Sequence, residues 1–484
     1  MSRWLICRRS AAALGAAGLF ASALLVACGG GGSGGGTYEV RVTVSGLDGS
    51  GLLLQNNNAD DLAVATSGEQ TFTTLLARGA TYNVGVKTQP RMLQQTCTVS
   101  GGAGTVAAAA VSSVRVVCVT PTPLFAYTAN SNNAAGSNLA ATGSVSAYKV
   151  GTLGGLNAAN GGAWESVPRR PASVVVDSLA QFVYLGRSGD SGTTALVAYA
   201  INGITGALTL RSGNSAFSSI AYPQAMALGP SGTQLFVAGN GSGSGAQLGL
   251  HTVDPVSGSL GSPSTLATWS GYAVSALVAD PQGRFVVVGL AGASGNKLAV
   301  FRRNTSDGAL TAWASLVDLT TPPRALAIDP GGRWLYIASN GPGLDDHLVR
   351  ALELPADATE ALRAIGAATT VNDSPVDLAV HPRGTYLYVV RQASTARKVS
   401  VFPLGASGAL GTEVPEQNVG DHGTGIDPAQ IRIDAPGTYA YVSNTGSNTI
   451  SIFRVDPSSG GLTPADTPTV GTGTEPLGLA LIAR

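Results

Sequence analysis

Residues 375–390 read PVDLAVHPRGTYLYVV, and this stretch decides the fold because similar segments recur along the chain. An apolar run, a polar turn containing Pro and Gly, and a second apolar run are typical of two antiparallel strands. Seven segments align on the first residue of this pattern, with 48 to 53 residues between successive starts: Pro171, Pro223, Val274, Pro323, Pro375, Pro428 and Pro476. Self-similarity at a fixed period of this length indicates a repeat architecture.

A fixed internal spacing shows what each repeat builds. In the first six repeats, an aromatic residue or valine stands 13 residues after the start: Tyr184, Phe236, Val287, Tyr336, Tyr388 and Tyr441. Each unit continues with a third strand-like run, a turn ending in Gly-Ala-Leu or a similar triplet, and a more polar fourth segment. Four strands in about 51 residues predict one blade of a β-propeller.

The two ends of the repeat region complete one another. The last repeat, PLGLALIAR at 476–484, ends after its first strand, whereas LFAYTAN at 124–130 matches a second strand. We therefore expect the C-terminal strand to form the innermost strand of a blade whose other strands come from residues 124 to about 168. This arrangement predicts an all-β, seven-bladed propeller over residues 121–484, and closing the ring removes two open sheet edges.

The features that carry a family resemblance are the repeat period, YVSN at 441–444 and phrases such as HPRGTYLYVV. In these features the chain resembles the 6-phosphogluconolactonase-like (lactonase) family and the related YVTN-repeat proteins. The resemblance covers about 360 residues, and it implies a seven-bladed propeller. The resemblance is specific for the fold and not for lactone hydrolysis, because one fold supports many functions. The histidine and arginine phrases of the family's catalytic motif are not recognisable, so no catalytic residue is carried over.

The N-terminus has the layout of an export signal. Three arginines precede the apolar stretch AAALGAAGLFASALLVA, and residues 25–28, LVAC, resemble the lipobox of bacterial lipoproteins. This predicts a signal peptide at 1–27, and a lipidated Cys28 with a Gly/Ser tether at 28–36. Partnership with a membrane through acylated Cys28 follows, and Gly29 favours the outer membrane of the cell envelope. The alternative is a conventional signal with a chance cysteine near the cleavage point.

Residues 37–120 predict a small immunoglobulin-like β-sandwich, because short strand-like runs alternate with turn residues every 8 to 12 positions. Cys97 and Cys118 lie in two such runs. Export places them in an oxidising compartment, so a disulfide is expected, the alternative being two buried free thiols. No metal site is expected, because there is no Cys-x-x-Cys pair and no histidine near either cysteine.

Charge excludes one class of partner. The chain has 28 basic and 28 acidic residues, so no net field gathers nucleic acid. The 12% share of charged residues is about half the usual proportion, and the 65 glycines suit many tight turns. Nothing in the sequence indicates a cofactor.

Repeat position selects candidate channel residues. The third and fifth places of the inner strands are mostly small, as expected near a narrow axis. Asp377, Gln430 and Arg432 depart from this pattern, and adjacent inner strands bring Asp377 close to Arg432. Two interpretations remain open: an ion pair that joins two blades, or a pair that faces a ligand.

Loop residues give weaker candidates. His422 in VGDHGTGIDP and His347 in GPGLDDHLV fall in loops on the expected binding face, and Arg324 and Arg391 are expected on the same side. A lactone hydrolase needs a base to activate water and cations to stabilise the oxyanion. His422 with Asp421 is the candidate base, and Arg324 or Arg391 the candidate cation.

Two functions therefore compete. The first is a membrane-anchored propeller that binds a protein, glycan or small ligand on its loop face, and the second is an exported lactone hydrolase. The low charge and the missing catalytic phrase favour the first, whereas the family resemblance favours the second. Whether the protein is an enzyme stays open at this point.

Overall fold

The computed structural model describes residues 36–132, 142–159, 165–167, 169–187, 196–211, 220, 222–241, 245–304, 308–313, 316–343, 346–355, 361–392, 398–415 and 426–484. The predicted signal, lipobox and tether up to residue 35 lie outside these ranges. Over the described part of the chain, no helix combines the length and the apolar character needed to cross a membrane.

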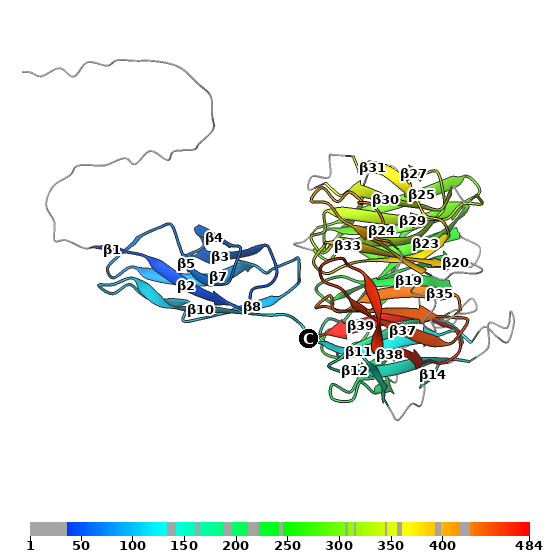
Figure 1. The fold of residues 1–484 in the computed structure, drawn as a ribbon, viewed down its shortest axis with the longest axis horizontal. Coiled ribbons are helices and arrows are strands. Elements are labelled where there is room, and N and C mark those ends of the chain that lie inside the picture. Colours follow the sequence, from blue (N-terminus) through cyan, green and yellow to red (C-terminus); the bar gives the residue numbers. More distant parts are fainter. Residues whose placement is uncertain are drawn as a thin grey trace, which may run out of the picture.

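Ten strands build the N-terminal sandwich, coloured blue to cyan in Figure 1. One sheet has the order β5-β2-β10-β8, the other β4-β3-β7-β9, and β1 pairs with β6. The bounds are β1 Thr37–Tyr38, β2 Val40–Ser45, β3 Leu52–Asn56, β4 Asp60–Val64, β5 Gly68–Thr71, β6 Leu76–Ala77, β7 Thr81–Thr88, β8 Thr96–Ser100, β9 Ala103–Thr105 and β10 Val111–Val119.

The sandwich core follows from strand alternation. Successive side chains of a strand point to opposite faces, so Val40, Val42 and Val44 of β2 are buried while the residues between them are not. Cys97 on β8 and Cys118 on β10 are direct cross-strand partners. Their sulfurs are 2.01 Å apart, so the expected disulfide is present in the structure.

Seven sheets form the propeller. Written from the inner strand outward, the first three blades are β39 (Pro476–Ala483), β11 (Pro123–Asn130), β12 (Gly143–Val150) and β13 (Leu156–Ala158), with β14 (Glu165–Val167) also on β12; β15 (Pro171–Val176), β16 (Phe182–Arg187), β17 (Leu196–Ile201) and β18 (Leu208–Leu210); and β19 (Tyr222–Leu228), β20 (Gln234–Gly241), β21 (Gly245–Thr252) and β22 (Ser264–Trp269).

The remaining four blades follow the same plan, although the described part of the sixth blade has three strands. They are β23 (Tyr272–Ala279), β24 (Phe285–Gly292), β25 (Gly295–Arg303), β26 (Leu310–Ala312) and β27 (Val317–Leu319); β28 (Pro323–Ile328), β29 (Trp334–Ser339), β30 (Leu348–Glu353) and β31 (Arg363–Thr370); β32 (Ser374–Val380), β33 (Tyr386–Gln392) and β34 (Lys398–Pro403); and β35 (Pro428–Ile433), β36 (Tyr439–Asn444), β37 (Thr449–Val455) and β38 (Leu462–Gly471). The inner strands contact one another in a closed circle.

The first blade joins the two ends of the repeat region, as the sequence predicted. Inner strand β39 pairs antiparallel with β11, and Ala480 lies opposite Tyr127. Thr122 and Arg484 exchange two backbone hydrogen bonds of 2.9 and 3.0 Å at the end of this pair. The fold is therefore an all-β, seven-bladed propeller closed by the C-terminal strand and preceded by a β-sandwich.

The aromatic residue 13 positions after the start of a repeat holds neighbouring blades together. The Tyr184 hydroxyl donates to the Gly258 carbonyl of the next blade at 3.1 Å, and Tyr388 donates likewise to Gly460 at 3.0 Å. Both glycines have positive φ, and an added Cβ would collide with an aromatic ring of the preceding blade. Glycine is needed there for both its conformation and its lack of a side chain.

A carboxylate organises the turn after several inner strands. Asp329 accepts hydrogen bonds from the backbone N–H groups of Gly331, Arg333 and Trp334. His381 stands in this place in the sixth blade, where its Nδ1 lies 3.1 Å from the Arg383 backbone nitrogen and its Nε2 lies 3.0 Å from the Gly437 carbonyl oxygen. His381 is therefore a turn residue.

The sandwich lies against this turn-bearing face. Figure 1 shows it to one side of the propeller, linked by the short segment between β10 and β11. The Arg383 guanidinium donates to the Asp48 carbonyl at 3.2 Å, and a Cβ at Gly331 would lie 2.9 Å from the Met92 methyl group. The start of each inner strand, where Arg324 stands, is at the opposite face.

Candidate ligand site in the central channel

The inner strands surround a channel cavity of about 400 Å³. Most of its wall consists of alanine and aliphatic side chains, because seven converging strands leave little room near the axis. The polar side chains of the wall are few: Ser173, Gln224, Ser275, Arg324, Asp377, Gln430 and Arg432. Apolar residues are thus the majority of the wall, although polar atoms make up most of its accessible surface, and a hollow with a few convergent polar side chains is a common form of a small-molecule site.

A backbone irregularity sets which side chains face this cavity. In all seven blades the pairing register between the first two strands shifts just after the leading residue, as between Pro323 and Ala325 of β28. A β-bulge re-aims side chains. The residue inside the bulge, Gln224 in β19 and Arg324 in β28, lines the cavity and is exposed to it.

Asp377 and Arg432 form an ion pair between two neighbouring blades. Arg432 Nη1 lies 2.9 Å from Asp377 Oδ2, and the same oxygen accepts the Ile431 backbone N–H at 2.9 Å. Arg432 also donates to Gln430 Oε1 at 3.1 Å, and that oxygen accepts the Leu479 N–H at 2.7 Å. These contacts connect the inner strands β32, β35 and β39.

The Asp377 carboxyl is more deeply buried than the Arg432 guanidinium. Desolvation raises the pKa of Asp377, and the Arg432 charge and the Ile431 N–H oppose this rise. The exposed fraction is 14% for the Asp377 side chain and 36% for Arg432. The pair joins two blades, and Arg432 still has one side open to the channel.

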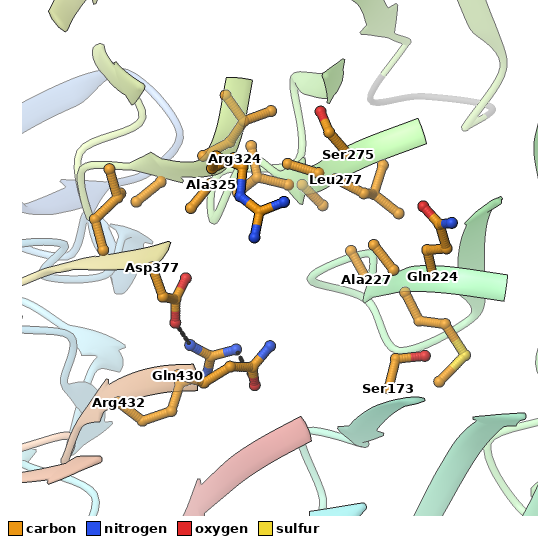
Figure 2. Close-up of a pocket in the computed structure, with 18 of the residues that line it drawn as sticks. Ser173, Gln224, Ala227, Ser275, Leu277, Arg324, Ala325, Asp377, Gln430 and Arg432 are labelled. Carbon is orange, nitrogen blue, oxygen red and sulfur yellow. Dashed lines mark hydrogen bonds and ion pairs between the residues drawn. The ribbon is translucent and has the colours of Figure 1, made fainter. Parts of the chain in front are cut away.

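Arg324 differs from Arg432. No other residue in the described part of the chain makes a hydrogen bond or ion pair with its guanidinium. Figure 2 shows this guanidinium pointing into the open centre of the channel, with Asp377 and Arg432 on one side and Gln224 on the other. An exposed cation without a protein partner leaves its donors free for a ligand.

The structure places the other predicted residues away from the cavity. Arg391 is 1% exposed, and its guanidinium lies 3.4 Å from carboxylate oxygens of both Asp373 and Glu413. Arg391 lies opposite Pro375, at the same end of its blade as Arg324 in its own, but it does not line the cavity because two carboxylates hold it inside the sixth blade. His347 does not line the cavity, and its Nδ1 is buried without a hydrogen bond among the described residues.

The predicted base, His422 with Asp421, lies outside the described residues. Within the described lining, Asp377 supplies the carboxylate, and this group is occupied by Arg432 and a backbone N–H. The described wall therefore provides the unpaired Arg324 guanidinium and the amides of Gln224 and Gln430. It provides no carboxylate or imidazole that is free to act as a base. The residues the structure describes contain no group of three His, Cys, Asp or Glu arranged to hold a metal ion.

One cavity residue was missed by the sequence analysis. Gln224 occupies the same place in its inner strand as Arg324 does two blades later, directly after the leading proline. The sequence pattern marks departures at the third and fifth places of the inner strands and does not mark the second place. The second residue faces the cavity because of a bulge, and the bulge depends on how the first two strands pair.

Comparisons with known proteins agree with this architecture. The family described as "Lactonase, 7-bladed beta-propeller" matches residues 261–343 and 415–476. The 6-phosphogluconolactonases of Yersinia pestis and Yersinia pseudotuberculosis are 27% identical over 185 residues, which is 35% of this chain and 50% of theirs. The chain thus spans about half the length of the curated relatives it matches.

Solved structures show the same fold over most of the chain. A putative 6-phosphogluconolactonase from Bacteroides uniformis has a TM-score of 0.60 at 20% identity, covering 74% of this chain and 99% of its own. A periplasmic gluconolactonase from Pseudomonas aeruginosa has a TM-score of 0.58 at 19% identity, covering 75% and 99%. The C-terminal part of this chain is therefore a lactonase-like seven-bladed β-propeller related to the 6-phosphogluconolactonases.

Proposed function

We propose that the protein is an exported lipoprotein of the cell envelope whose propeller binds a small polar ligand in its central channel. The observation that carries this proposal is the unpaired Arg324 guanidinium in a cavity of about 400 Å³. The guanidinium is exposed and has no protein partner among the described residues, so its donors are available to a ligand acceptor.

The distribution of the other polar groups supports this site. Asp377, Arg432 and Gln430 form a network that satisfies their strongest hydrogen-bonding groups. Arg324 stands apart from that network and faces the same space. The channel thus combines a fixed wall with a cation whose donors are available.

The position of the sandwich fits an anchored protein. Its contacts, through Asp48 and Met92, are with the turns that follow inner strands. Arg324 belongs to the start of its strand and so to the opposite mouth. A chain anchored at Cys28 would hold the Arg324 mouth away from the bilayer and open to solutes.

The test is a binding measurement on the full chain, extracted in detergent. Isothermal titration with gluconate, glucono-lactone and neutral sugars measures affinity for the wild type, Arg324→Gln and Arg454→Gln. Arg454 is exposed on β37 and does not line the channel, so it is the matched control. We expect Arg324→Gln alone to weaken binding at least tenfold. Equal binding by both variants would contradict the channel site.

Lactone hydrolysis is the second candidate function, and the family match favours it. A lactone carbonyl at Arg324 would gain a cation that stabilises the developing oxyanion. The candidate base is His422 with Asp421, as the sequence predicted. Turnover of a lactone panel by the wild type, with loss in His422→Ala and with normal ligand binding, would establish the enzyme. Wild-type rates equal to the buffer rate would leave a binding protein.

A further inference from the structure

We propose that the channel selects a ligand with a single negative charge, a monocarboxylate of monosaccharide size, and discriminates against phosphate esters. This inference rests on the proposed function and specifies its ligand. It is carried by the charge balance and the size of the cavity.

The charged residues of the described lining are Arg324, Asp377 and Arg432. Asp377 and Arg432 cancel one another, because they are joined at 2.9 Å. The net charge that the described lining offers to a ligand is therefore one positive charge at Arg324. A second negative charge on the ligand would find no unpaired cation in that described lining and would lie in the same small cavity as the Asp377 carboxylate.

The form of the cation favours a carboxylate. A guanidinium presents a planar set of donors that matches the two oxygens of a carboxylate, so one arginine can bind one carboxylate through two parallel hydrogen bonds. A phosphate ester near pH 7 carries almost two charges, and protein sites for it commonly add a helix N-terminus or a second cation. The described channel wall is made of the edge strands of the sheets, and it contains neither a helix N-terminus nor a second unpaired cation.

The dimensions set the size of the ligand. Ligand pockets usually occupy about 300–1,000 Å³, and this cavity lies near the lower limit. Ala225, Ala227, Leu277 and Ala325 form apolar parts of the wall, while the exposed Gln224 amide offers both a donor and an acceptor for hydroxyl groups. These features fit the carboxylate and hydroxyl groups of a small sugar acid.

The experiment compares three open-chain probes of different charge, namely gluconate, 6-phosphogluconate and glucitol, by titration calorimetry on the full chain in detergent at fixed ionic strength. We expect gluconate to bind at least tenfold more tightly than both others, and Arg324→Gln to remove this preference. Stronger binding of 6-phosphogluconate, with sensitivity to Arg324→Gln, would overturn the single-charge inference and leave the channel site standing. Failure of all three probes to bind would contradict the proposed function as well.

A gain-of-function variant tests the charge balance directly. Gln224→Arg adds a second cation at the place that Arg324 occupies in its own strand, and Gln224 is exposed, so folding is preserved. We expect at least a tenfold gain in affinity for 6-phosphogluconate relative to gluconate. Gln224→Met, which changes the size of the side chain little and adds no charge, is the control. An unchanged ratio in Gln224→Arg would overturn the inference.

Discussion

The Tyr441 hydroxyl donates a hydrogen bond of 2.9 Å to the carbonyl oxygen of Gly154, 287 residues earlier in the chain. Tyr441 belongs to the last complete repeat and Gly154 to the turn between β12 and β13 of the first blade. The contact therefore joins the last blade of the propeller to the first. Gly154 has a φ of 75° and packs against the ring of Tyr439.

Replacing Tyr441 with Phe removes this contact and leaves a buried carbonyl without its donor. We expect the free energy of unfolding to fall by about 1–3 kcal/mol, the cost of an unsatisfied buried group. Tyr439→Phe is the matched control, because no described residue bonds its hydroxyl. Chemical denaturation monitored by fluorescence measures both. Equal stability of the two variants would contradict an inter-blade role for the hydroxyl.

Removing residues 476–484 should destabilise the whole propeller. The deletion eliminates β39 and leaves β11 with an unpaired edge. It also uncovers apolar surface on the first and last blades, where Leu479 is 1% exposed. We expect the Tm of the main transition to fall by more than 10 °C. Deleting Arg484 alone, which loses the two backbone bonds with Thr122 and the bond from the Thr122 hydroxyl, should cost much less. An unchanged Tm for the long deletion would contradict the ring closure.

Sequence periodicity predicted the blades well because each repeat is a local unit. The aromatic residues 13 positions after each repeat start, such as Tyr184 and Tyr441, reflect a strand spacing that depends on nearby residues only. Their hydrogen-bond acceptors, such as Gly258 for Tyr184, come from another blade and have no mark in the repeat itself. The same contrast, between local spacing and contacts that come from another part of the chain, explains which site residues the sequence could predict.

Asp377 and Arg432 stood out because they break a pattern of small residues, and neighbouring inner strands necessarily bring them close. Arg391 looked equally favourable in sequence. Its burial depends on Asp373 and Glu413, which come from segments on either side of its strand. Repeat position gives the direction of a side chain, whereas its pairing depends on tertiary contacts that no repeat position encodes.

Stability should depend on pH through Asp434. Burial raises the pKa of this carboxyl to about 6 from an ordinary value of 3.8. The folded state thus binds the proton more tightly than the unfolded state, so this contribution to stability is fully present below pH 3.8 and is lost as the pH rises through 6. Between pH 4 and 6 we expect wild-type stability to fall by up to about 3 kcal/mol relative to Asp434→Asn. Parallel pH profiles from urea denaturation would contradict this.

Cys28→Ser should release the protein from membranes. A lipobox cysteine carries the acyl chains, and each buried methylene contributes about 0.8 kcal/mol to membrane binding. Ultracentrifugation of cell lysates with immunoblotting measures the partition. Cys7→Ser, within the predicted signal, is the control and should leave the protein in the membrane fraction. Retention of Cys28→Ser together with Cys7→Ser would exclude lipid anchoring at this residue.

Breaking the pair of Asp377 and Arg432 should destabilise the propeller, but by less than for a fully buried ion pair. Breaking a buried pair costs about 3–5 kcal/mol because one charge is left without a partner. Arg432→Met leaves the Asp377 carboxylate, which is 14% exposed. Because neither member of the pair is fully removed from solvent, we expect about 1–3 kcal/mol for this variant. The double variant Asp377→Asn with Arg432→Met leaves no lone charge and should recover most of this loss. Denaturation measurements on both variants, repeated with gluconate, separate a structural pair from a ligand-contacting one. A structural pair lowers stability with or without gluconate, whereas full stability of Arg432→Met with abolished binding would show that Arg432 contacts the ligand.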